Sequence, residues 1–118
     1  MEISLQGFHE DVATLACTTE LAEGVPVAVT ENGTVAAATA NQPFCGITAG
    51  PSRDGYVAVQ LTGYARATYS GTEPKVGYQS LSAGADGSIC TTPSSGATGR
   101  TMLVLDVDTT AKTAGFLL

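Results

Sequence analysis

Two carboxylates, Asp106 and Asp108, stand two residues apart in the apolar stretch MLVLDVDTTAKTAGFLL, residues 102–118. Because side chains alternate along a strand, we expect both acids on one face, together with Met102 and Val104. Carboxylates placed in this way could bind a metal ion or act as an acid–base pair. The chemistry that they suggest is therefore calcium binding or acid–base catalysis.

The residues around this pair favour a structural role instead. A polar segment, DTTAKT, follows at once, and AGFLL then returns as the final strand. Asp108 is therefore expected to initiate a turn as an Asx residue, and Asp106 to be a charge at the end of the strand, satisfied by water or backbone amides. A third acidic ligand would have to come from Asp54, Glu73 or Asp86. We expect no metal site, no catalytic pair and no cofactor.

Nucleophilic catalysis lacks a well-placed base in this sequence. The single histidine is His9, within the first ten residues, which are expected to form an arm outside the fold. The three cysteines, Cys17, Cys45 and Cys90, have no CxxC spacing, which fits reduced thiols. No GxxxxGK or GxGxxG loop is present to bind phosphate. The sequence predicts a protein that is not an enzyme.

Charge and length narrow the class further. A net charge of −6 over 118 residues would repel a polyanion, so nucleic acid is not an expected partner. No window approaches the roughly 18 apolar residues of a membrane span, and MEISLQGFHE does not resemble a signal peptide. We therefore expect synthesis in the cytoplasm and no membrane partner. The small aliphatic core without tryptophan suggests that the chain gains stability by forming a homo-oligomer.

Three Asx-Gly pairs predict tight turns between short strands. They are Asn32-Gly33, Asp54-Gly55 and Asp86-Gly87, and each precedes a run of small or β-branched residues. Such pairs supply the positive φ angles that hairpins need. Residues 24–38 and 77–92 share the order glycine, strand, Asx-Gly, strand, which suggests an internal duplication.

The longest predicted ribbon is YVAVQLTGYARATY, residues 56–69, which alternates regularly between two faces. Gly63 near its centre predicts a bulge or bend, so that the ribbon could serve two sheets. One face carries Tyr56, Tyr64 and Arg66, residue types that are typical of binding surfaces. Alternatively, these tyrosines are ordinary surface residues of an antiparallel sheet.

The predicted fold is all-β, a small antiparallel β-sandwich or β-barrel of eight or nine short strands. DVATLAC, residues 11–17, is expected to be its first strand, and residues 11–118 to form a single β domain. Residues 1–10 would be an extended N-terminal arm whose Ile3, Leu5 and Phe8 pair with something outside the fold. An ordinary edge strand is the alternative for this segment.

The succession of segments resembles small proteins encoded in the head modules of tailed phages and prophages, among them the head-decoration, or cement, proteins. The segments are GVPVAVTENGTVAAA, FCGITAG, GYVAVQLTGYARATYSG, VGYQSLSAGADGSICT and LVLDVD with AGFLL, and the resemblance covers nearly the whole chain.

This resemblance implies a non-catalytic protein that binds the outer surface of an assembled capsid and stabilises the head, commonly as a trimer. The implied partner is the major capsid protein, and the implied location is the virion surface after synthesis in the bacterial cytoplasm. Ile3, Leu5 and Phe8 would dock by strand addition, and Tyr56, Tyr64 and Arg66 would add an open face.

A carbohydrate- or cell-surface-binding β-module of a phage particle is the alternative function. It would use Tyr64, Tyr69 and Arg66. The absence of tryptophan argues against it, because sugar-binding platforms favour large flat aromatic rings.

Overall fold

The computed structural model describes residues 11–93 and 99–118. The expected N-terminal arm, with Ile3, Leu5, Phe8 and His9, lies outside the described residues. Within them the chain forms ten β-strands and one short 3-10 turn, η1, Ala85–Gly87. The strands are β1 Asp11–Cys17, β2 Pro26–Glu31, β3 Thr34–Ala37, β4 Gly46–Thr48, β5 Tyr56–Thr62, β6 Tyr64–Thr68, β7 Gly77–Ala83, β8 Ile89–Thr91, β9 Arg100–Asp108 and β10 Thr113–Leu117.

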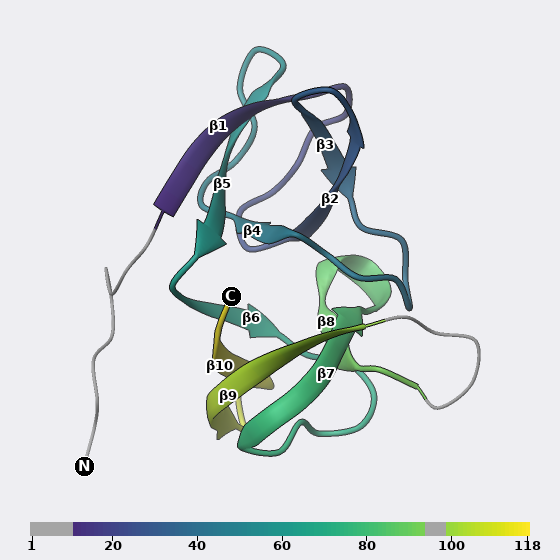
Figure 1. Cartoon of the computed structure of the whole chain (residues 1–118), viewed down its shortest axis with the longest axis vertical. Helices are drawn as coiled ribbons and strands as arrows, with labels where there is room; N and C mark the ends of the chain where they lie inside the picture. Colours follow the sequence, from purple (N-terminus) through teal and green to yellow (C-terminus); the bar gives the residue numbers. More distant parts are fainter. Residues whose placement is uncertain (1–10, 94–98) are drawn as a thin grey trace.

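The strands divide into two sheets that follow one another in the chain (Figure 1). The first is a closed barrel with the order β1-β3-β2-β4-β5, in which β1 pairs with both β3 and β5. The second is a five-stranded antiparallel sheet with the order β6-β10-β9-β7-β8. The all-β prediction is confirmed. The described residues hold ten strands rather than eight or nine, because the long ribbon splits into β5 and β6.

That ribbon turns the predicted corner at Gly63, which has a φ of +92°. The side chain of Gln60, which is buried, stabilises the corner: its Nε2 donates to the carbonyl of Thr62 at 3.1 Å and to that of Tyr64 at 2.6 Å. An L side chain rarely adopts such a φ, so glycine suits this position. The ribbon therefore serves both sheets, as its sequence predicts.

The Asx-Gly pairs lie in turns that separate strands. Gly33 connects β2 to β3, and Asp86 and Gly87 lie in η1 between β7 and β8; all three have positive φ. Asp54 and Gly55 also have positive φ, and Arg53 and Tyr56 on either side of them exchange backbone hydrogen bonds of 2.7 and 2.9 Å. The three turn predictions are confirmed.

Each sheet encloses a hydrophobic cluster, and the loop before β4 joins the two. The barrel cluster is Cys17, Leu21, Val27, Val35, Val57 and Val59. Phe44 and Ile47, from the loop and β4, pack into the cluster of the second sheet, where the rings of Phe44 and Phe116 meet edge to face at 6.3 Å. The loop also exchanges backbone hydrogen bonds with Ala83, the last residue of β7. These contacts fix the barrel against the second sheet.

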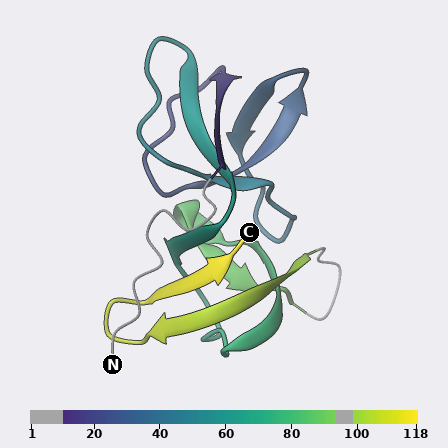
Figure 2. The same ribbon diagram turned by 60° about the vertical axis from the view of Figure 1, so that its left-hand side comes forward.

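The C-terminus lies between the two sheets, as both views of the ribbon show (Figure 2). The amide of Leu118 donates to the carbonyl of Gly63 at 2.9 Å, which ties the end of the chain to the corner. The Leu118 side chain packs against the core of the second sheet. The corner and the C-terminus therefore form one junction.

Candidate functional site

The acidic pair at the end of β9 is placed by a β-bulge. Gly115 of β10 pairs with Asp106, and Phe116 pairs with Val104, so Leu105 is an extra residue on β9. One extra residue reverses the alternation of side chains. Val104 is therefore buried while Asp106 is exposed. The expectation that Asp106 and Asp108 share a face with Met102 and Val104 is wrong for this reason.

Asp106 belongs to a network of side chains on the exposed face of the second sheet. Its carboxylate forms an ion pair with Arg66 Nη2 and accepts a hydrogen bond from the Tyr64 hydroxyl at 3.2 Å. Arg66 also donates to the Tyr64 hydroxyl at 3.2 Å and to Thr113 Oγ1 at 2.8 Å. The expectation that water or backbone amides satisfy Asp106 is corrected, because the fold brings these side chains to it from β6 and β10. We call Tyr64, Arg66, Asp106 and Thr113 the Arg66 network.

Gly115 makes this network possible. It lies on β10 between Arg66 on β6 and Asp106 on β9. A Cβ at this position would collide with the Tyr64 hydroxyl and with Asp106 Oδ1, and would stand 2.7 Å from Tyr64 Cζ. Glycine inside a strand often marks such a close approach. The glycine of the AGFLL segment was thus a sign of the network, but the sequence alone did not connect it to Arg66.

The charges of the network are compensated but remain in contact with solvent. Partial burial lowers the pKa of Arg66, but its contacts with Tyr64 and Asp106 outweigh this effect, so the pKa is raised. The side chains of Arg66 and Asp106 are 38% and 56% exposed. An ion pair at that exposure contributes at most about 1 kcal/mol to stability. The network therefore orders a surface more than it stabilises the fold.

Asp108 has a separate, structural role. Its Oδ1 accepts hydrogen bonds from the backbone amides of Thr110 and Ala111, each at 3.0 Å. This is the predicted Asx turn, which joins β9 to β10. Among residues 11–93 and 99–118, no group of three or more His, Cys, Asp or Glu side chains could hold a metal ion.

A row of large side chains crosses the same exposed face beside the network. Tyr64 pairs with Leu117, Leu117 with Leu103, and Leu103 with Tyr78, so the row spans β6, β10, β9 and β7. Directly paired residues point to the same side of a sheet. Tyr78 is 75% exposed, and Leu105 at the bulge is also exposed. We call Tyr64, Leu117, Leu103 and Tyr78 the tyrosine row.

The structure separates the three residues predicted for the open face. Tyr64 and Arg66 lie together on β6, whereas Tyr56 lies at the far end of β5, in the barrel, where it pairs with Ala16. The six-residue step from Tyr56 to Thr62 corresponds to about 20 Å of strand. Sequence reasoning did not predict that Leu103, Leu117 and Tyr78 share a surface with Tyr64. Only the strand register aligns them in one row with it.

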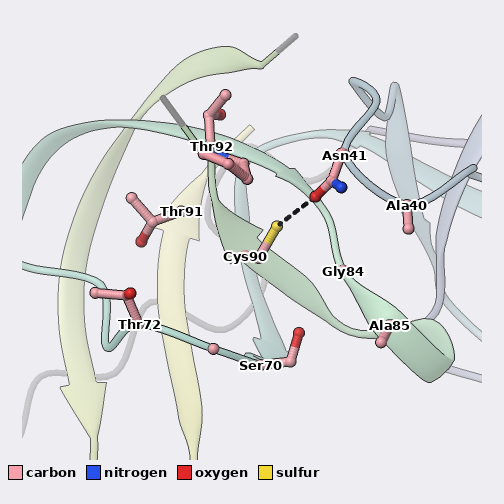
Figure 3. A pocket seen from close by; sticks show the side chains of 11 residues that line it. Ala40, Asn41, Ser70, Thr72, Gly84, Ala85, Cys90, Thr91 and Thr92 are labelled. Carbon is pink, nitrogen blue, oxygen red and sulfur yellow. Dashed lines mark hydrogen bonds between the residues drawn. The ribbon is translucent and has the colours of Figure 1, made fainter. Parts of the chain in front are cut away.

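A hollow of about 650 Å³ is lined by residues 40–41, 70–72, 84–85 and 90–93. Its lining is small and neutral, and includes Asn41, Ser70, Thr72 and Cys90. Figure 3 shows the Cys90 side chain directed towards Asn41, whose Oδ1 lies 4.0 Å from the sulfur. Burial raises the pKa of the Cys90 thiol, which makes it a poor nucleophile at neutral pH.

All three cysteines are free thiols, as predicted. Cys17 is buried in the barrel, and Cys45 and Cys90 are half-buried. No helix in the described part of the chain has the length and apolar character needed to cross a membrane.

Comparison with known proteins adds no family to this description. No protein-family model matches the chain, and no curated protein shows significant similarity to it.

Proposed function

We propose that this protein is a non-catalytic decoration protein, which binds the outer surface of an assembled phage head and stabilises it. The observation that supports this proposal is the exposed face of the second sheet. There the tyrosine row lies beside the ordered Arg66 network. Tyrosine and arginine are enriched at the centres of protein interfaces.

The chemistry of this face suits a protein partner. Tyr64 belongs to both the row and the network, so it links an apolar strip to a set of fixed hydrogen-bonding groups. The hydrogen bonds already hold Tyr64 and Arg66 in place, so little side-chain entropy is lost on binding. We propose the major capsid protein as the partner and a homotrimer as the bound form, as the resemblance to decoration proteins implies.

Stabilisation of the head would follow from mass action. A ligand that binds only the folded, assembled lattice shifts the equilibrium towards that lattice at every site that it occupies. Such a ligand needs no catalytic group. It would act on the virion surface after synthesis in the bacterial cytoplasm.

A sugar-binding module is the weaker proposal. It relies on Tyr64, Tyr69 and Arg66 as one platform, but Tyr69 is only 8% exposed and belongs to the core of the second sheet. A buried ring cannot stack on a sugar. We therefore favour the capsid partner.

Co-sedimentation with assembled heads tests the proposal. Purified heads that lack this protein would be mixed with the wild-type chain, with Tyr64→Ala or with Tyr56→Ala, and separated on a density gradient. We expect the wild type and Tyr56→Ala to travel with the heads in a fixed ratio to the capsid protein, and Tyr64→Ala to remain at the top. Wild-type protein that stays at the top would reject the decoration function.

The role of the N-terminal segment has its own test. Deletion of residues 1–10, which removes Ile3, Leu5 and Phe8, should abolish co-sedimentation if these residues dock by strand addition. Circular dichroism of the shortened chain would show whether the β fold is retained. Full attachment of the shortened chain would remove the segment from the proposal and leave the exposed sheet face.

A further inference from the structure

We infer that the chain is a tandem of two copies of one five-stranded unit, residues 11–62 and 64–118, and that each copy unfolds locally as one unit. The inference extends well beyond the two hairpins whose sequences suggested a duplication. It rests on strand order, register and buried positions, and it is independent of the proposed function.

The strand order is the same in both units. Read from β3, the closed barrel has the order β3-β2-β4-β5-β1, and the second sheet, read from β8, has the order β8-β7-β9-β10-β6. Numbered within each unit, both read third, second, fourth, fifth, first. Consecutive strands usually lie side by side. In both units, however, the first strand does not pair with the second, and this shared exception is a distinctive feature.

Both units bring their first and third strands together in parallel. In the barrel, Cys17 pairs with Val35 in the β1–β3 ladder. In the second unit, Tyr69, directly after β6, forms a parallel bridge with Ile89 of β8. The first and third strands therefore meet in parallel in both units, as a ladder that closes the barrel in the first and as one isolated bridge in the second.

The registers of two antiparallel ladders also correspond. Between the first and fifth strands, Ala13–Val59 and Leu15–Val57 correspond to Ala65–Phe116 and Ala67–Ala114. Between the second and third strands, Val29–Val35 corresponds to Ala83–Ile89. Between the second and fourth strands, Pro26 pairs with Ile47 and its counterpart Ser80 with Thr101. The ladder between the fourth and fifth strands instead matches Ile47, paired with Gln60, to Leu103, paired with Leu117, so the fourth strands are shifted by two residues between these two ladders. An even shift keeps the same side chains on the buried face.

The buried positions of the barrel cluster agree with this alignment, whereas the exposed Val29 corresponds to the fully buried Ala83. Five of the six residues of the barrel cluster have a counterpart in the cluster of the second sheet, the exception being Leu21. The corresponding pairs are Cys17 and Tyr69, Val27 and Leu81, Val35 and Ile89, Val57 and Ala114, and Val59 and Phe116.

The hairpin turns retain a trace of the common sequence. Asn32-Gly33-Thr34-Val35 and Asp86-Gly87-Ser88-Ile89 each contain Asx, Gly, a hydroxyl residue and a β-branched core residue. Val35 and Ile89 are both fully buried. In both hairpins a glycine with positive φ is thus followed, two residues later, by a fully buried β-branched residue.

The alignment shows where the units differ. Tyr64 and Arg66 of the Arg66 network, and Gly115, which pairs with Arg66, correspond to Val12, Thr14 and Ala58 of the barrel. These barrel residues carry no charge. The fold itself does not require the network, since one copy of the unit lacks it.

Matched core variants of the full chain test the inference. Val35→Ala and Ile89→Ala remove volume from corresponding sites, so each should loosen its own unit. We expect amide hydrogen exchange, followed by mass spectrometry, to rise about tenfold or more within residues 11–62 for Val35→Ala and within 64–118 for Ile89→Ala. Equal acceleration of both units by either variant would overturn the inference.

A second measurement needs no variant and covers the case in which an alanine variant does not fold. Native-state exchange of the unmodified chain at increasing urea should give one opening equilibrium for β1–β5 and a different one for β6–β10. A single opening equilibrium shared by all ten strands would overturn the inference.

Discussion

Arg66 on β6 and Asp106 on β9 form an ion pair across Gly115, the residue of β10 that lies between them. The two charges neutralise one another, and Tyr64 contacts both. The carboxylate of Asp106 therefore already has partners, and a metal ion or a substrate would have to displace them to bind it. Its position orders a patch of the exposed sheet, and this role differs from the turn-forming role of Asp108 only two residues later.

Gly115→Ala is expected to break the Arg66 network without unfolding the protein. The added methyl would meet the exposed ends of Tyr64 and Asp106, which can move away. Loss of the ion pair costs at most about 1 kcal/mol, and alanine in a strand regains roughly 0.5–1 kcal/mol over glycine. Urea denaturation should therefore change little, while co-sedimentation with heads should be lost.

Gly50→Ala is the matched control, because nothing lies within 4 Å of the added Cβ. It should leave both stability and co-sedimentation unchanged. Normal attachment of Gly115→Ala would show that the order of the network is irrelevant to binding.

The two aspartates should respond differently to substitution. Asp108→Ala removes the acceptor of two backbone amides and is expected to lower the free energy of unfolding by about 1 kcal/mol, as loss of a helix cap does. Asp108→Asn keeps an acceptor oxygen and should cost much less. Asp106→Asn removes only an exposed charge and should cost under about 1 kcal/mol.

Urea denaturation of the three variants gives these values, and calorimetric titration with calcium provides a second readout. We expect no calcium binding by the wild type or any variant. Calcium binding by the wild type that disappears in Asp106→Asn would restore the metal site that the sequence first suggested.

The sequence was informative where local backbone chemistry decides the structure. Asp54-Gly55 and Asp86-Gly87 predicted turns because few other dipeptides accept positive φ at both positions. Gly63 predicted the corner for the same reason. These features depend on one or two neighbouring residues, so they can be predicted from one sequence.

The surface site could not be predicted in the same way. The bulge at Leu105 depends on how β9 pairs with β10, and without it the alternation placed Asp106 on the buried face. Likewise, Tyr78 meets Leu103 only through the β7–β9 register. Long-range pairing is not encoded in local spacing, so the tyrosine row and the Arg66 network emerged only from the fold.

The corner between the sheets should depend strongly on Gln60 and Gly63. Gln60→Leu leaves the carbonyls of Thr62 and Tyr64 without their side-chain donor, which is expected to cost about 1–3 kcal/mol. Gly63→Ala forces a side chain into a φ of +92° and should also cost about 1 kcal/mol or more. Thermal and urea denaturation would measure both, again with Gly50→Ala as the control. Wild-type stability of both variants would mean that the junction does not hold the sheets together.

Alkaline pH should destabilise the protein through its half-buried thiols. Burial raises the pKa of Cys45 and of Cys90 above the ordinary 9.0. As the pH rises past that ordinary value, thiols of the unfolded chain lose protons that the folded chain still holds. The unfolded state then binds fewer protons, so the free energy of unfolding falls with rising pH. Below the ordinary value both states are protonated, and this contribution to stability is complete.

Urea midpoints measured from about pH 8 to about pH 10 would show this fall, which begins near the ordinary thiol pKa. The Cys45→Ala, Cys90→Ala double variant should lose most of the pH dependence there, although its stability at neutral pH would be lower because two half-buried side chains become smaller. Tyr69, whose pKa is raised by burial and by Glu73 and Asp108, would add a further decline at higher pH in both proteins. An equally steep fall in the urea midpoint of the double variant over this pH range would assign the effect to groups other than Cys45 and Cys90.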